Sequence, residues 1–295
     1  MKINPLKSLA GLVKTSAFLS ASALFGFANA AFAAGTGLAE PGQISMQEPV
    51  TEVARDIHSF HDWVLMPIIT VITIFVGLLL LYVMYRFNAK ANPVASKTTH
   101  HTGLEVAWTV IPVMILVIIA LPSFKLLTKE VVIPKADLTI KVTGKQWYWS
   151  YEYPKDQGGF SFDSLLSDQT KLTADQPRLL TVDNEFVVPV NKVVRMQITA
   201  ADVIHSFIIQ SFGMRMDAVP GRLNETWFKA EREGVYYGQC SKLCGKDHAY
   251  MPIMVRVVSD EKYAEWLAGA KKKFASNGNI PLNVADITVS TQVQN

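Results

Sequence analysis

Two cysteines, a histidine and a methionine stand within twelve residues of one another in the second half of the chain. Cys240, Cys244, His248 and Met251 follow the spacing C-x3-C-x3-H-x2-M, and the chain contains no other cysteine. Thiolate and thioether ligands select copper, whereas imidazole binds copper or zinc. Because each of two thiolates can bridge, this segment could hold two copper ions. A second histidine would complete such a site, and His205 lies about 35 residues upstream.

Several simpler explanations fit the same residues. Two cysteines in an exported chain can form a disulfide, and two cysteines with two histidines can bind zinc. Met251 could belong to the hydrophobic core, and His248 could be a solvated loop residue. Each candidate taken alone is compatible with a structural role, but four of them at this spacing favour a metal site.

Composition indicates which class of protein carries this segment. Hydrophobic residues make up 49% of the 295 residues and charged residues only 18%, which is typical of a chain with a membrane portion. The net charge of +3 is too small to indicate a nucleic-acid partner. Two cysteines are too few for a disulfide scaffold.

The N-terminal segment has the features of a secretory signal peptide. Residues 1–14 are basic and contain no acid, and residues 15–27 form an apolar run too short to span a bilayer. Small-x-small cleavage sites follow at residues 28–30 and 31–33. We therefore expect a signal peptide that ends at residue 33 and a periplasmic arm at residues 34–60.

Two uncharged runs predict a transmembrane helical hairpin at residues 61–127. The runs cover residues 63–85 and 106–124, and each is long enough to cross the hydrocarbon core. The loop at residues 86–104 contains three lysine or arginine residues and no acid, so the positive-inside rule places it in the cytoplasm. Both ends of the chain are then expected on the periplasmic side.

The chain after the hairpin is expected to form an all-β domain, at residues 128–275, that ends in a helix. Short alternating or β-branched runs separated by turn residues indicate a sandwich or barrel. The expected strands cover residues 138–143, 146–153, 179–182, 193–199, 206–209, 226–229, 234–238 and 253–258. An amphipathic helix follows at residues 260–275, and residues 276–295 read as a flexible tail. His205 would precede one strand and the cysteine segment would join the last two, so both could meet at one end.

The cysteine segment, GQCSKLCGKDHAYMP, closely resembles the copper loop of the cytochrome c oxidase subunit II family, C-S-E-L-C-G-x-x-H-x-x-M-P. The resemblance covers roughly residues 57–265. It implies a cupredoxin-like domain, which is a Greek-key β-sandwich or barrel, with a dinuclear copper centre called CuA. The implied copper ligands are His205, Cys240, Cys244, His248, Met251 and the backbone carbonyl of Lys242.

Lys242 departs from the family pattern, which usually has Glu at this position. A backbone carbonyl ligand survives the change, because any residue supplies one. In the family, the Glu side chain also helps to bind magnesium at the boundary with the catalytic subunit. Lysine cannot do this, so the usual magnesium site is in doubt here.

The segment KQWYWSYEYP at residues 145–154 is dense in aromatic side chains. Alternating aromatic residues normally pack one face of a strand, and those beyond the needs of one face could bind a partner. The resemblance implies that Trp147 is where electrons from cytochrome c are accepted, with Tyr148, Trp149 and Tyr151 as packing residues.

Further roles also follow from the resemblance. Four acids match the family's docking face for cytochrome c, where charge speeds association: Glu152, Asp163, Asp183 and Asp202. From the residues alone, such acids could simply provide solubility.

Glu105 stands at the cytoplasmic end of the second helix and could be a solvated boundary carboxylate. The resemblance implies that it lies at the mouth of a proton-uptake channel of the catalytic subunit.

The sequence thus resembles the electron-accepting subunit of a proton-pumping cytochrome c oxidase in the bacterial inner membrane. The expected partners are the catalytic haem–copper subunit, other oxidase subunits and cytochrome c, and no nucleic acid. Oxygen chemistry would occur in the partner subunit, because no nucleophile–base pair stands out in this chain. Two other hypotheses are a quinol oxidase subunit II, which lacks the copper, and a membrane-tethered copper-binding or assembly protein. A fused covalent haem is excluded, because the chain has no C-x-x-C-H.

Overall fold

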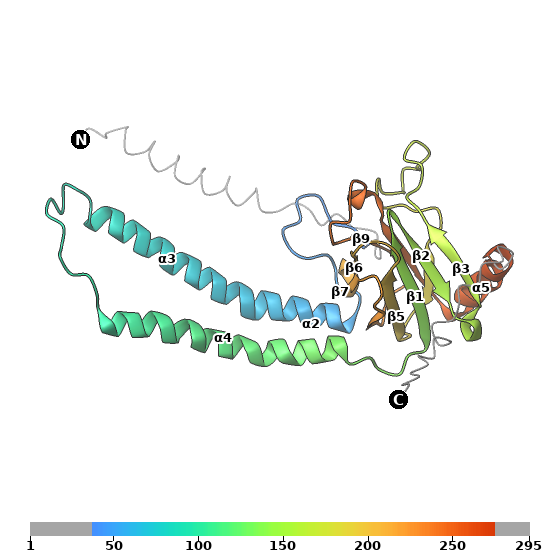
Figure 1. The fold of residues 1–295 in the computed structure, drawn as a ribbon, viewed down its shortest axis with the longest axis horizontal. Helices are drawn as coiled ribbons and strands as arrows, with labels where there is room; N and C mark the ends of the chain where they lie inside the picture. Colours follow the sequence, from blue (N-terminus) through green and yellow to red (C-terminus); the bar gives the residue numbers. More distant parts are fainter. Residues whose placement is uncertain (1–36, 275–295) are drawn as a thin grey trace, which may run out of the picture. The chain divides into compact units, whose positions relative to one another are not determined.

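The computed structural model describes residues 37–274. Within these residues, two long helices are followed by a two-sheet β domain and a C-terminal helix (Figure 1). This order confirms the expected fold class of a helical hairpin before an all-β domain. The expected signal peptide at residues 1–33 and the expected tail at residues 276–295 lie outside the described residues.

The first long helix is built of three consecutive segments. They are α2 at Glu52–Phe60, the π-helical stretch η1 at His61–Leu65, and α3 at Met66–Arg86. The second long helix, α4, spans Thr102–Val131. Both runs are long and apolar enough to cross a membrane, and their apolar side chains are exposed.

Each long helix extends beyond the uncharged run that predicted it. The first is capped by Thr51, whose Oγ1 accepts the N–H of Ala54 at 3.0 Å. The second is capped by the imidazole of His101. The expected spans, residues 63–85 and 106–124, therefore cover only the central parts of the helices. Polar turns at helix ends do not show in a hydrophobicity pattern, although they continue the same backbone hydrogen bonding.

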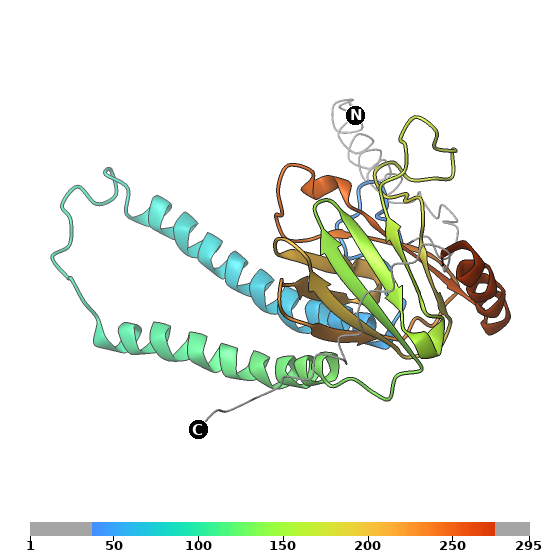
Figure 2. The same ribbon diagram turned by 45° about the vertical axis from the view of Figure 1, so that its right-hand side comes forward.

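The β domain consists of two five-stranded sheets that face each other (Figure 2). The first sheet has the order β3-β2-β1-β5-β8, and the second has the order β4-β10-β9-β6-β7. The strands of the first are Leu138–Lys145 (β1), Tyr148–Tyr153 (β2), Phe160–Ser164 (β3), Val194–Ala200 (β5) and Asn224–Phe228 (β8). Those of the second are Phe186–Pro189 (β4), His205–Ile209 (β6), Met214–Ala218 (β7), Gly234–Cys240 (β9) and Ile253–Val258 (β10). β1 pairs with β5, and β4 with β10, in parallel, and the other pairs are antiparallel.

The core lies between the two sheets and is rich in aromatic rings. Trp149, Tyr151 and Tyr153 of β2 all point inward and are fully buried, as alternation along a strand requires. Trp149 meets Phe207 of the opposite sheet edge to face at 5.1 Å, and Tyr151 stacks on Phe186 at 4.7 Å. The inward rings of this segment are therefore packing residues, as the alternation indicated.

Most expected strands exist, but one is wrong and three were missed. Residues 178–180 form a turn in which Leu179 has φ +64, and Val182 makes only an isolated bridge with Leu166. The missed strands are β3, β4 and β7. β4 is only four residues long and buried throughout, so it has no alternation for a pattern to reveal.

The C-terminal helix α5 (Asp260–Phe274) covers aromatic side chains of the first sheet. Its Trp266 lies 5.3 Å from the ring of Tyr153, and its Phe274 stacks on Phe162 at 4.7 Å. The acids early in α5 and the lysines late in it complement the helix dipole. The amphipathic helix expected at residues 260–275 is confirmed.

Helix α2 is attached to the β domain rather than standing free. The N–H of Val50 donates to Ser211 O at 2.8 Å, and Thr51 Oγ1 donates to Phe212 O at 2.7 Å. Gly213 has φ +64, and a Cβ there would come within 2.8 Å of the Ala54 backbone. The end of α4 is held as well, because Trp227 Nε1 donates to Lys129 O at 3.2 Å.

Candidate metal centre

The cysteine segment joins β9 to β10 at one end of the sandwich. Cys240 is the last residue of β9, and His205 is the first residue of β6. Since β6 and β9 pair antiparallel with Phe207 opposite Cys240, the two candidate ligands come to the same end. The N–H of Ser241 then donates to Ser206 O at 2.9 Å and anchors the start of the loop. The expected meeting of the two segments is therefore confirmed.

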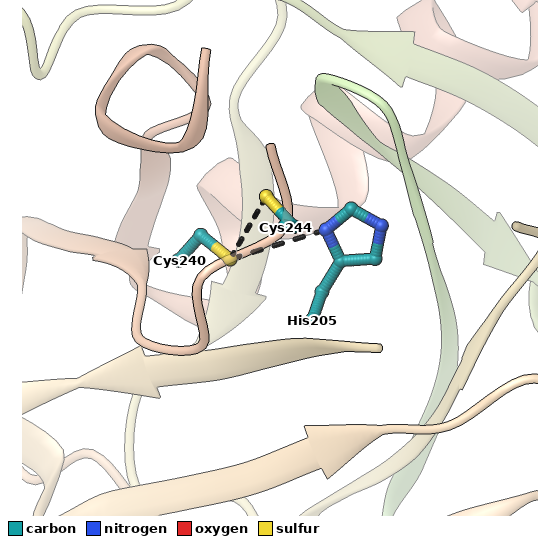
Figure 3. A group of neighbouring side chains, drawn as sticks. All are labelled: His205, Cys240 and Cys244. Carbon is teal, nitrogen blue, oxygen red and sulfur yellow. Dashed lines mark hydrogen bonds between the residues drawn. The ribbon is translucent and has the colours of Figure 1, made fainter. Parts of the chain in front are cut away.

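Three of the candidate ligands form one buried cluster. Ligand atoms of His205, Cys240 and Cys244 all lie within 4.8 Å of one another. The two sulfurs are 3.9 Å apart, and Cys240 Sγ is 3.9 Å from Nδ1 of His205 (Figure 3). Both cysteines are free, which argues against the disulfide explanation.

The remaining candidates surround the same pair of sulfurs. Nδ1 of His248, in the short helix η4 (His248–Tyr250), lies 3.6 Å from Cys244 Sγ. Met251 Sδ lies 3.6 Å from the same sulfur and is buried, and Lys242 O lies 3.3 Å from Cys240 Sγ. The sequence-predicted ligands are thus all brought together. A set of two thiolates, two imidazoles and a thioether is consistent with a copper site of the CuA kind.

Asp202 fixes the orientation of the His205 imidazole. His205 Nε2 donates to Asp202 Oδ1 at 2.9 Å, so Nδ1 is the nitrogen turned toward Cys240. Burial lowers the pKa of His205, but its hydrogen bonds with Cys240 and Asp202 outweigh burial and raise it. Burial raises the pKa of Asp202, but the hydrogen bonds donated to it by His205 and two backbone N–H groups lower it on balance.

The two thiols differ in how readily they lose a proton. Burial disfavours the thiolate of Cys240, but hydrogen bonds from His205 and the surrounding backbone offset this and lower its pKa. Burial raises the pKa of Cys244, and the adjacent negative charge of Cys240 raises it further. A positive charge between the two sulfurs, such as a metal cation, would favour ionisation of both thiols.

Two glycines allow the close packing around the site. A Cβ on Gly144 would stand 2.9 Å from Cδ2 of His205, so only glycine leaves room for the imidazole. Gly245 has φ +126, and a Cβ there would stand 2.9 Å from the ring of Trp147. Trp149 completes the packing, because its Nε1 donates to Met251 O at 3.2 Å.

Trp147 lies in the turn between β1 and β2, next to the metal loop. Its Nε1 donates to Cys244 O at 3.3 Å, and Lys246 Nζ lies 5.6 Å from its ring centroid. The side chain of Gln146 donates to the same Cys244 carbonyl at 2.9 Å. Gln146 and Gly144 could not be identified from the sequence, because neither residue type signals chemistry and only the fold brings them to the loop.

The four expected docking acids have different surroundings. Glu152 pairs with Lys141 at 3.1 Å, and Asp163 lies 3.7 Å from Lys145. Asp183 instead accepts the backbone N–H of Leu165 at 2.8 Å. The fourth, Asp202, is hydrogen-bonded to a candidate metal ligand, a second role that the sequence analysis missed.

The two remaining expected residues are Glu105, on helix α4, and Lys242, in the metal loop. Glu105 is in the first turn of α4, and its Oε1 accepts the N–H of His101 at 3.1 Å. The Lys242 ammonium lies 3.9 Å from a carboxylate oxygen of Asp217 on β7. Asp217 is held in turn by Asn224, whose Nδ2 donates to its carbonyl at 2.7 Å.

Comparisons with known proteins agree with this arrangement. Residues 39–126 match the model of the cytochrome c oxidase subunit II transmembrane domain, and residues 138–258 match that of the periplasmic domain. The probable cytochrome c oxidase subunit 2 of Rickettsia bellii is 52% identical over 81% of this chain and 87% of that protein. The cytochrome c oxidase subunit 2 of Cereibacter sphaeroides is 47% identical over 80% of this chain and 82% of that protein.

Among solved structures, the periplasmic domain of cytochrome oxidase subunit II of Bradyrhizobium japonicum is 66% identical to this chain, with a TM-score of 0.46. The match covers 48% of this chain and 99% of that one. The two family models together span most of the present chain, helices and β domain alike. The chain therefore belongs to the cytochrome c oxidase subunit II family, and it is a membrane subunit with two transmembrane helices and a periplasmic copper-binding domain that serves aerobic respiration.

Proposed function

We propose that this subunit accepts electrons from reduced cytochrome c at a dinuclear copper centre and passes them to haem in the catalytic subunit. Oxygen reduction to water and proton pumping take place in the assembled complex. One observation carries the proposal: two sulfurs 3.9 Å apart are each flanked by an imidazole Nδ1, His205 beside Cys240 and His248 beside Cys244. Such a near-symmetric set supports a site for two metal ions, for which these four side chains would supply the main ligands.

Each surrounding residue has a defined task in this proposal. His205 and His248 would each bind one copper through Nδ1, and the two sulfurs would bridge. Met251 Sδ and the carbonyl of Lys242 would be the weak outer ligands. When bound, the copper pair supplies storage for one electron. The rigid β scaffold limits how far these ligands move when the charge of the site changes.

Magnesium of the kind implied by the family does not fit the residues present. The Lys242 ammonium lies 3.9 Å from Asp217 Oδ2, so a positive side chain already faces the available carboxylate. A divalent cation prefers oxygen ligands and would be repelled by that ammonium. No step of the proposed function depends on magnesium.

Trp147 is proposed as the residue through which electrons reach the site. Its indole donates a hydrogen bond to the carbonyl of Cys244, one of the residues that would hold copper, and the ring is partly exposed. Glu152, Asp163, Asp183 and Asp202 would orient a basic cytochrome c over this face by long-range attraction.

The two transmembrane helices carry the residue proposed for proton uptake, and the loop between them sets the proposed orientation in the membrane. Glu105 would stand at the cytoplasmic end of α4, where it takes up protons for the catalytic subunit. The positively charged loop between α3 and α4 lies on the cytoplasmic side of a bacterial inner membrane, and the β domain lies in the periplasm. The chain would divide into a signal peptide (1–33), an arm (34–60), the hairpin (61–127), the copper domain (128–275) and a tail (276–295). The helices cross two of these boundaries, because the first long helix begins at Glu52 and α4 ends at Val131.

Electron paramagnetic resonance of the copper-loaded full-length chain tests the proposal. We expect two copper ions per chain and the hyperfine pattern of one unpaired electron shared equally by two nuclei. Cys244→Ser should abolish that pattern, because one bridge is lost. One copper with a localised spin would contradict the proposal and favour a copper-carrier function.

A further inference from the structure

The turn between β1 and β2 is fastened to both segments that carry metal ligands. The backbone N–H of Gln146 donates to Asp202 Oδ2 at 2.7 Å, and Asp202 holds His205. The side-chain amide of Gln146 donates to Cys244 O at 2.9 Å. Gln146 is thus connected to the His205 side of the site through its backbone and to the cysteine loop through its side chain.

Gln146 and Trp147 share a single acceptor. A backbone carbonyl has two lone pairs, and the Cys244 carbonyl receives one bond from each of these two side chains, at 2.9 and 3.3 Å. The Trp147 bond is the longer, and a hydrogen bond of that length restrains a side chain only weakly. The shorter bond from Gln146 therefore sets where the carbonyl lies relative to the indole.

Both side chains pack closely against the metal loop. A Cβ at Gly245 would meet the Gln146 amide nitrogen at 3.2 Å and the Trp147 ring at 2.9 Å, so both side chains lie directly against the loop backbone. Lys246 extends over the ring of Trp147. The indole is therefore bounded by the loop backbone and the Lys246 ammonium, while the Gln146 amide holds the Cys244 carbonyl to which it donates.

From these contacts we infer that Gln146 is a positioning residue that holds the Trp147 indole against the Cys244 carbonyl. The inference rests on the proposed role of Trp147 in accepting electrons. It adds a residue whose side chain acts on the indole through the carbonyl of Cys244.

Two substitutions remove the donor in different ways. Gln146→Glu keeps the shape but places a carboxylate oxygen against the carbonyl oxygen, so the contact becomes repulsive. Gln146→Met removes the donor without adding charge. Gln239→Glu is the matched control, because Gln239 is exposed and adjacent to Cys240, and it adds the same charge without disturbing the β1–β2 turn.

The first measurement uses the copper-free full-length chain and does not depend on activity. We expect deuterium exchange of the Trp147 indole N–H, followed by nuclear magnetic resonance, to be about five- to tenfold faster in both Gln146 variants, since about one hydrogen bond's worth of restraint is lost. The signal is assigned by its absence in Trp147→Phe. Gln239→Glu should exchange like the parent protein. Unchanged exchange in both Gln146 variants would overturn the inference.

The second measurement uses the assembled oxidase. Electron transfer from reduced cytochrome c should slow by about tenfold in both Gln146 variants at unchanged copper content, because displacing a positioned group by about 1 Å can lower a rate by up to about a hundredfold. If Trp147→Phe slows transfer and the Gln146 variants do not, the inference fails and the proposed function stands. If Trp147→Phe leaves transfer unchanged, the proposed role of Trp147 fails and this inference fails with it.

Discussion

Asp202 accepts the Nε2 hydrogen of His205 at 2.9 Å and thereby turns Nδ1 of the imidazole toward the sulfur of Cys240, 3.9 Å away. The same carboxylate accepts the N–H groups of Gln146 and Val203. Three donated hydrogen bonds keep it ionised and fixed. Such a partner sets both the tautomer and the ring orientation of a metal-binding histidine.

We expect Asp202→Asn to weaken copper binding by about tenfold to a hundredfold, the usual cost of losing a carboxylate behind a metal-binding histidine. Loss of a negative charge beside the site should also raise its reduction potential. Competition with a copper chelator measures the first effect, and potentiometric titration the second. Asp183→Asn removes a comparable charge away from the ligands and should change neither. Equal effects of the two substitutions would show that the His205 contact is unimportant.

The ligands of this site could be predicted from the sequence because residue type and spacing carry the information. Cys240, Cys244, His248 and Met251 lie in one loop, and two thiols with a thioether narrow the choice of metal. Gln146 could not be found in this way, because its role depends on a carbonyl nearly one hundred residues away in sequence. The hydrogen bond between Asp202 and His205 exists only in the folded turn. For this reason the sequence suggests only the docking role of Asp202.

The fold was predictable where hydrophobic periodicity was strong. The strands around Leu138–Lys145 and Tyr148–Tyr153 alternate cleanly between buried and less buried residues, and both were expected. Residues 179–182 were expected as a strand because they are apolar, but positive φ at Leu179 makes a turn there. The parallel pairing of β1 with β5 depends on contacts distant in sequence, which no local pattern encodes.

The proposed docking face should show a specific order of charge effects. Lys141 stands 3.1 Å from Glu152 and cancels much of its field, whereas Asp183 is bonded to a backbone N–H and keeps its full charge. We therefore expect Asp183→Asn to slow association with cytochrome c by about threefold, and Glu152→Gln by less. Stopped-flow rates as a function of ionic strength measure this, and the difference should shrink with salt. The reverse order, or rates independent of salt, would rule out the acidic-face model.

Lys242→Glu should strengthen the binding of a divalent cation beside Asp217. The substitution replaces the ammonium beside Asp217 with a second carboxylate, so two oxygen ligands would face each other. We expect the assembled oxidase carrying Lys242→Glu to bind Mn²⁺, used as a paramagnetic substitute for Mg²⁺, more tightly than the parent complex. Lys246→Glu, which changes the same charge at an exposed position four residues further along, should not. Equally tight Mn²⁺ binding by the parent complex would show that Lys242 does not block the site.

The contact between helix α2, the arm and the β domain should weaken in acid. Glu231 pairs with Arg55 at 2.7 Å, and Glu48 pairs with Arg232 at 2.7 Å. In each pair the hydrogen bond from the arginine is the main cause that lowers the pKa of the carboxylate. A carboxylate whose pKa is lower in the folded than in the unfolded protein stabilises the fold at any pH above its unfolded pKa, which is 4.5 for Glu. This stabilisation is lost as the pH falls through the pKa of the folded state.

Because these pairs are partly exposed, each is worth only about 0.5 kcal/mol after solvent screening. Thermal unfolding of the full-length chain between neutral pH and pH 3.5 should therefore show a shallower decline in Glu231→Gln than in the parent protein. Glu265→Gln is a suitable control, since Glu265 is exposed on α5, away from this contact. Parallel pH profiles for parent and Glu231→Gln would exclude a contribution from this pair.

A substitution at Glu105 tests whether this residue takes up protons without contributing to electron transfer. Its carboxylate accepts the N–H of His101 in the first turn of α4, at the end of the helix opposite to the β domain. If it passes protons to the catalytic subunit, Glu105→Gln should lower steady-state oxygen consumption by roughly tenfold or more, as expected when a proton-transferring group is removed. Electron transfer from cytochrome c to the copper site in a single turnover should be unchanged, because no residue of that site is touched. Glu130→Gln, near the other end of the same helix, should leave steady-state turnover intact. A parallel loss of both rates in Glu105→Gln would indicate a structural defect and remove the proton-uptake assignment.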